Sequence, residues 1–256
     1  MIPSKIGDVV TTYREIPPSG RLRRYVECYW SQDQQGPGDY VVLPDGCVDL
    51  LFSRGDAGAG HLATVGLMTT PLRVEGAPVR LYFGVRFRPG MASAFFPGAQ
   101  LLTDQTRPLD DLAGNAGRRM FERLAESDSL EEMGGLMDQL LRPLDPPDLG
   151  ARVLWQLESA ELSLDQVILH SGLSVRHFRR LCLERAGVSP KHLSRILRFR
   201  KAVGRITAVK GLAQPSWADF AVACGYYDQA HFIREFRQFA GCTPGRFLQS
   251  RKSDLE

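Results

Sequence analysis

Long apolar runs are missing from this 256-residue sequence. No window offers the roughly 18 uninterrupted apolar residues that a membrane-spanning helix needs. The first 20 residues also contain no apolar core of the length found in secretory signals. We therefore expect a cytoplasmic protein that has no membrane partner. Its content of 43% hydrophobic and 24% charged residues is typical of a packed globular chain.

Paired cysteines are missing as well. The cysteines are odd in number, and none forms a Cys-x-x-Cys pair, which argues against a disulfide framework and against a structural zinc site. We expect buried free thiols, no metal and no cofactor. Neither a nucleophile-and-base motif nor a phosphate-cradling glycine motif occurs, so we expect no enzyme activity. The five cysteines are Cys28, Cys47, Cys182, Cys224 and Cys242.

The formal net charge of +3 hides an asymmetry between the two halves of the chain. Residues 1–150 carry 15 basic and 20 acidic side chains, whereas residues 151–256 carry 17 basic and 9 acidic ones. Such unevenness indicates that the basic half meets a polyanion, although a solvated basic face without a partner is the alternative.

The N-terminal half, residues 1–145, is strand-rich. Short β-rich runs between about Tyr25 and Phe87 alternate with glycine and proline, a pattern typical of a small antiparallel β-barrel or sandwich. Helical stretches follow at about 90–142. The clearest has an apolar stripe that could pack on the strands or on its twin in a second subunit: Leu130, Met133, Met137, Leu140 and Leu141.

The C-terminal half, residues 151–256, contains a pattern that occurs twice. Phe178 matches Phe232 and Gly187 matches Gly241, both at a separation of 54 residues. Each copy is predicted to be a short helix, a turn and a second helix, in units at about 162–190 and 215–244. Gly172 and Gly225 close the first helices, and Ser174 and Asp228 cap the second ones. The fold class is therefore α+β, with an all-α C-terminal domain.

Two such units form a double helix-turn-helix domain, in which the second helix of each enters a major groove of double-stranded DNA. A helix at about 190–209 joins them as a rigid spacer of about 30 Å, close to the ~34 Å turn of a duplex. A helical-hairpin repeat that binds only protein is the alternative. The expected contacts are Ser174, Val175, Arg176, His177, Arg179 and Arg180 in the first recognition helix, Asp228, Gln229, Ala230, His231 and Arg234 in the second, and Lys191, Arg198, Arg200 and Lys201 on the DNA backbone.

Residues 155–250 resemble the AraC/XylS family of bacterial transcription regulators. The most specific part is ACGYYDQAHFIREFRQFAGCTPGRF, whereas the first copy departs from the family at Ile168 and Cys182. The strings YVECYW, LPDGCVDLLF and GVRFRPG resemble an uncharacterised sensor-like domain that often precedes such modules. The resemblance implies a cupin-like barrel that binds a small-molecule effector or forms a homodimer, and contact with RNA polymerase if the protein is an activator. His61 is the one histidine of this half, which disfavours a metal-using cupin.

An effector pocket would combine aromatic walls with a few polar groups. The candidates are Trp30, Tyr40, Asp49, Tyr82, Arg86 and Phe87, for which ordinary core or surface positions are the alternative. The leading hypothesis is a sequence-specific, effector-responsive regulator of transcription. A DNA-directed enzyme, such as an alkyl-transfer repair protein, is the alternative, but Cys28 and Cys47 lack the cysteine cluster that would lower a thiol pKa. A pure interaction protein is disfavoured by the arginines of the recognition helices.

Overall fold

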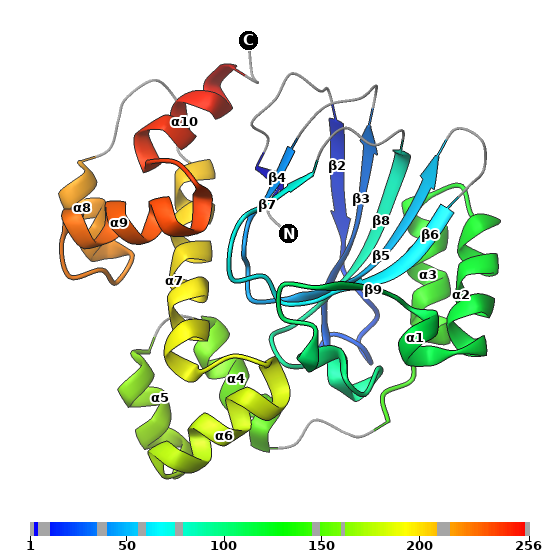
Figure 1. Cartoon of the computed structure of the whole chain (residues 1–256), viewed down its shortest axis with the longest axis horizontal. Helices are drawn as coiled ribbons and strands as arrows, with labels where there is room; N and C mark the ends of the chain where they lie inside the picture. Colours follow the sequence, from blue (N-terminus) through cyan, green and yellow to red (C-terminus); the bar gives the residue numbers. More distant parts are fainter. Residues whose placement is uncertain are drawn as a thin grey trace.

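The computed structural model describes residues 3–4, 11–34, 40–55, 60–74, 79–144, 149–159, 162–208 and 216–253. The chain is α+β, with a strand-rich N-terminal half followed by an all-helical C-terminal half (Figure 1). The prolines of the expected linker, Pro146 and Pro147, and the expected start of the second unit, Pro215, lie outside the described residues. Within the ranges given, no helix is both long enough and apolar enough to cross a bilayer.

Two antiparallel sheets form the N-terminal half. The larger has the order β2-β3-β8-β5-β6-β9, and the smaller has the order β1-β4-β7. Strands β1, β2 and β9 lie outside the segment in which strands were predicted, because their sequences lack a clear apolar alternation. The strands are β1 (Pro3–Ser4), β2 (Thr11–Ile16), β3 (Val26–Gln34), β4 (Tyr40–Val42), β5 (Val48–Gly55), β6 (Gly60–Val65), β7 (Leu72–Val74), β8 (Val79–Phe87) and β9 (Thr106–Pro108).

Successive side chains of a strand point to opposite sides, so the two faces of the larger sheet carry different residues. One face is covered by α1 (Asp110–Ala113), α2 (Asn115–Ala125) and α3 (Leu130–Leu140), which Figure 1 places together on one side of the strands. The predicted apolar stripe of α3 packs on this face, where Gly134 approaches Ile16 and Tyr29. Two 3₁₀ turns, η1 (Ala92–Ala94) and η2 (Ala99–Leu101), follow β8.

The C-terminal half consists of seven helices within the described residues. Glycines with positive φ end both recognition helices, Gly187 at 75° and Gly241 at 73°, and Gly172 and Gly225 occupy the turns before them at 67° and 82°. The helices are α4 (Leu149–Ser159), α5 (Leu164–Ser171), α6 (Val175–Ala186), α7 (Pro190–Thr207), α8 (Trp217–Ala223), α9 (Gln229–Ala240) and α10 (Pro244–Ser253).

The two halves pack directly on each other. One continuous cluster of buried side chains runs from Leu22 in the N-terminal half to Leu248 in α10. Gly187 lies so close to the backbone of Gln100 that a Cβ atom would overlap its carbonyl oxygen. Gly46 lies against α7, where a Cβ atom would stand 3.1 Å from a methyl group of Leu197. The helical half is therefore held in a defined orientation.

Candidate nucleic-acid interface

The first recognition helix, α6, presents a basic surface. Ser174 caps it, with its hydroxyl accepting from the amide of His177 at 3.2 Å, which satisfies one of the free N–H groups of the first turn. Val175 is 68% exposed at the start of the helix. Phe178 and Cys182 are buried on the opposite side. The predicted contact residues that stand exposed are Ser174, Val175, Arg176, His177, Arg179 and Arg180.

The second recognition helix, α9, is built in the same way. The carboxylate of Asp228 caps it by accepting from the amide of His231 at 2.7 Å. Three phenylalanines bury the inner side, namely Phe232, Phe236 and Phe239. Of the predicted contact residues, Asp228, Gln229, Ala230 and Arg234 are exposed, whereas His231 is half-buried.

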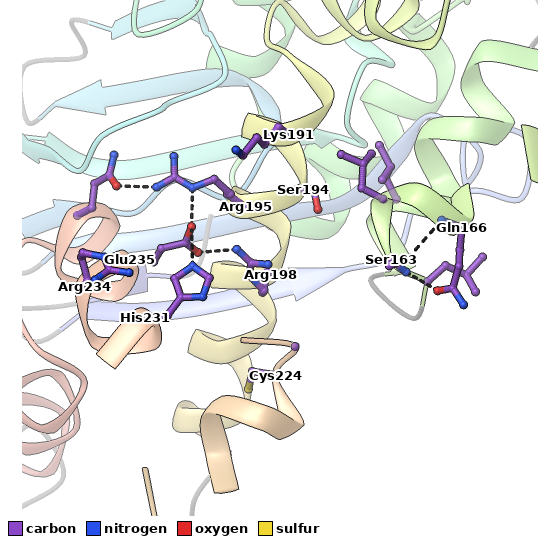
Figure 2. A pocket seen from close by; sticks show the side chains of 15 residues that line it. Ser163, Gln166, Lys191, Ser194, Arg195, Arg198, Cys224, His231, Arg234 and Glu235 are labelled. Carbon is purple, nitrogen blue, oxygen red and sulfur yellow. Dashed lines mark hydrogen bonds and ion pairs between the residues drawn. The ribbon is translucent and has the colours of Figure 1, made fainter. Parts of the chain in front are cut away.

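A groove of about 870 Å³ lies between the two units. Helix α7 forms one wall, and the start of α5 and the inner turns of α9 form the others. Figure 2 shows the labelled side chains of α7 and α9 on one side and those of α5 on the other. Among the described residues, four cationic side chains line the groove against one carboxylate, that of Glu235. The cations are Lys191, Arg195, Arg198 and Arg234.

Glu235 is the centre of a hydrogen-bond network in this groove. Its carboxylate, 6% exposed, accepts from Nε of Arg195 at 2.5 Å and from a terminal nitrogen of Arg198 at 2.8 Å (Figure 2). Nε2 of His231 stands 3.5 Å from the same carboxylate. Burial raises the pKa of Glu235, but the hydrogen bonds and charges of the two arginines outweigh it and lower the pKa below its usual value.

The four residues that were predicted to contact the DNA backbone lie in different surroundings. Lys191 is exposed in the groove, and Lys201 is half-buried. Arg198 bonds Glu235 and stacks over the ring of Tyr226 at 4.6 Å. Arg200 was expected to face DNA, but its side chain points toward the N-terminal half. Its guanidinium donates to Glu27 of β3 and stands 3.5 Å from the sulfur of Cys47.

Arg195 is a groove residue that the sequence analysis missed. Its spacing from Lys191 and Arg198, four and three residues along one helix, places all three on one face and was an available signal. Its terminal nitrogen donates to Gln238 at 2.6 Å, and its guanidinium lies 5.3 Å from the ring centre of Phe239.

The predicted effector residues are divided between the two faces of the larger sheet. Trp30, Asp49, Tyr82 and Arg86 are buried on the face opposite the helices, where the indole of Trp30 lies across Gly84. Phe87 follows Arg86 directly and points to the other face, against Phe95 and Phe96, which corrects its assignment to a shared pocket. Tyr40 belongs to β4, but its side chain lies outside the described part of the chain.

Three carboxylates surround the buried side chain of Arg86. Its guanidinium stands 3.2 Å from Glu15, 3.6 Å from Asp45 and 3.8 Å from Asp49. Burial, and then the charges of Asp45 and Glu27, raise the pKa of Asp49 to about 7. The indole nitrogen of Trp30 and one carboxylate oxygen of Asp49 have no hydrogen-bond partner in the described chain.

The cysteines do not have the surroundings of a reactive thiol. All five are buried and free. Burial raises the pKa of each thiol, that of Cys182 to about 12, and the pKa of Cys47 rises although Arg200 is close to it. A nucleophilic cysteine needs the opposite shift, so this finding disfavours the alkyl-transfer alternative.

Two family models match the chain. Residues 14–108 match a domain of unknown function (DUF6597), and residues 169–250 match a helix-turn-helix domain. No curated protein matches. Among solved structures, the C-terminal domain of AraT, a response regulator from Geobacillus stearothermophilus, is 20% identical, covers 42% of this chain and 89% of its own, and has a TM-score of 0.37.

Two further solved structures are similar to the chain. An AraC-type regulator from Chromobacterium violaceum is 24% identical over 40% of this chain and 91% of its own, with a TM-score of 0.35. ToxT from Vibrio cholerae is 10% identical over 94% of this chain and 97% of its own, with a TM-score of 0.43.

Proposed function

We propose that this chain, a DNA-binding transcription regulator with an AraC-type helix-turn-helix domain, recognises one specific duplex sequence. Both α6 and α9 contact the bases of that sequence. The observation that carries the proposal is the pair of capped recognition helices, each with exposed polar side chains at its N-terminal end. A cytoplasmic location, a homodimer and, if the protein is an activator, contact with RNA polymerase belong to the same proposal.

Base reading follows from the chemistry of the exposed side chains. Arginine can pair with two acceptors of guanine, and glutamine can pair with adenine in the same way. Arg176 and Gln229 lie in the first turns of α6 and α9, the part of a recognition helix that reaches base edges. Helix α7 has 18 residues, so it is about 27 Å long, a length that approaches the ~34 Å turn of a duplex.

Competition between duplexes tests this function. We expect the purified full chain to bind a duplex selected from a random pool at least ~10³-fold more tightly than an unselected one at physiological salt, because base contacts add to backbone contacts. Fluorescence anisotropy with unlabelled competitor measures the ratio. Equal affinity for both duplexes would contradict sequence-specific regulation.

We further propose that the N-terminal half binds a small effector on the sheet face around Trp30 and Arg86. The support is chemical: a buried N–H of Trp30 and a buried oxygen of Asp49 lack hydrogen-bond partners among the described residues, and such groups are costly unless something satisfies them. An effector with both a donor and an acceptor would satisfy the two groups together.

Native mass spectrometry of the full chain purified from cells tests this site. Trp30→Phe removes the indole N–H but keeps an aromatic ring, so a retained small molecule should be lost from this variant. Trp217→Phe, in α8, is the matched control and should keep the molecule. Absence of any retained mass in the wild-type chain, or equal retention by both variants, would exclude the effector site.

A further inference from the structure

The groove between the two helix-turn-helix units contains a carboxylate on the surface expected to meet DNA. Glu235 belongs to α9, the second recognition helix, and its partners Arg195 and Arg198 belong to α7. A carboxylate repels DNA phosphate, so its position in a cationic groove needs a reason. We propose that Glu235 is a positioning residue, which holds Arg195 and Arg198 ready to clamp the DNA backbone that crosses this groove.

Both arginines are held from more than one side. Glu235 accepts from each of them, while Gln238 bonds Arg195 and the rings of Phe239 and Tyr226 lie under the two guanidinium groups. A free arginine side chain loses rotamer entropy when it is fixed. Side chains that are already fixed lose less on binding, so a phosphate is bound more tightly.

The same bonds leave donors for a phosphate. Each guanidinium has five N–H groups, and the bonds to Glu235 and Gln238 use only some of them. The side chains of Arg195 and Arg198 are 25% and 24% exposed, and both line the groove. The guanidinium fork can therefore face the carboxylate on one side and a phosphate on the other.

The place of the groove identifies the ligand as duplex backbone. Residues from both units line it, with Ser163 and Gln166 of the first opposite Arg234 of the second (Figure 2). A duplex that engages α6 and α9 in successive major grooves must pass a backbone segment between them. This inference rests on the proposed function and adds a specific role for Glu235.

The salt dependence of binding to the selected duplex tests the inference. Each phosphate contact contributes about 0.9 to the slope of log K against log salt concentration. Glu235→Gln keeps the shape of the side chain but removes its charge. We expect affinity to fall about tenfold and the slope to become shallower by about 1 to 2, although the variant is more positively charged.

Glu184→Gln is the matched control. Glu184 is a carboxylate on the first recognition helix that stands 3.7 Å from Arg180 of its own helix, and both side chains are about two-thirds exposed. Its removal adds the same charge without releasing an arginine of the groove. We expect an unchanged or steeper slope and no loss of affinity.

A double-mutant cycle separates positioning from general support of the fold. If Glu235 acts through the arginines, Glu235→Gln should have no further effect on affinity once Arg195→Ala and Arg198→Ala are present. A full additional loss in that background, or an unchanged slope for Glu235→Gln alone, would overturn the inference. If the wild-type chain showed no preference for the selected duplex, the proposed function would be overturned instead. The two failures are therefore distinguishable.

Discussion

Replacing Arg176 and Arg234 together with alanine should remove most of the preference for the selected duplex. Both side chains are exposed, one on each recognition helix, and neither supports the core. An arginine that reads a base contributes about 1–3 kcal/mol, so the double variant should lose roughly 30-fold to 10⁴-fold in specific affinity. Affinity for an unselected duplex should fall far less, because the other cations remain.

Arg237→Ala is the control for this loss. Arg237 is exposed on the same helix as Arg234, but it lies in the last turn, away from the end that reaches bases. We expect a small and uniform loss of affinity for both duplexes. Anisotropy titrations of the variants measure both affinities. A double variant that prefers the selected duplex as strongly as the wild-type chain would show that Arg176 and Arg234 do not read bases.

Gly187→Ala should destabilise the whole chain strongly. Gly187 ends α6 with φ of 75°, where an alanine costs about 1 kcal/mol through its backbone alone. The new Cβ would also overlap the carbonyl oxygen of Gln100 and approach the hydroxyl of Thr103, and such overpacking costs about 1–3 kcal/mol. We expect a total loss of about 2–4 kcal/mol in the free energy of unfolding, measured with urea.

Gly172→Ala isolates the backbone part of this loss. Gly172 ends α5 with nearly the same φ, 67°, but apart from its own chain neighbours no atom of the described residues lies within 4 Å of the position that a Cβ would take. This variant should lose only about 1 kcal/mol. If both variants lost the same amount, the close contact between Gly187 and the N-terminal half would be absent in solution.

The sequence repeat predicted the helices of the C-terminal half well, because the start and end of a helix depend on residues that are close in sequence. Helix α6 begins directly after its predicted cap, and the predicted cap residues Ser174 and Asp228 accept the bonds expected of them. Helix α7 ends at Thr207, two residues before the predicted end. Caps and left-handed glycines act within one turn, so a single sequence contains the information.

Contacts between distant residues could not be predicted in the same way. Arg198 and Arg200 were assigned to DNA phosphate by charge and position, but their carboxylates come from Glu235 and Glu27, which lie 37 and 173 residues away. Only the fold brings these groups together. The error at Phe87 was avoidable, since neighbours on a strand cannot share a face with Arg86.

The packing between the halves has a consequence for recombination. Gly46 fits against Leu193 and Leu197, Glu27 pairs with Arg200, and Gly187 fits against Gln100, so each side of the boundary is shaped by the other. A chimaera that joins this N-terminal half to the DNA-binding domain of another protein would lose the side chains that fit these three contacts. A successful graft must therefore keep α7 together with the N-terminal residues that contact it, Glu27 and Gly46.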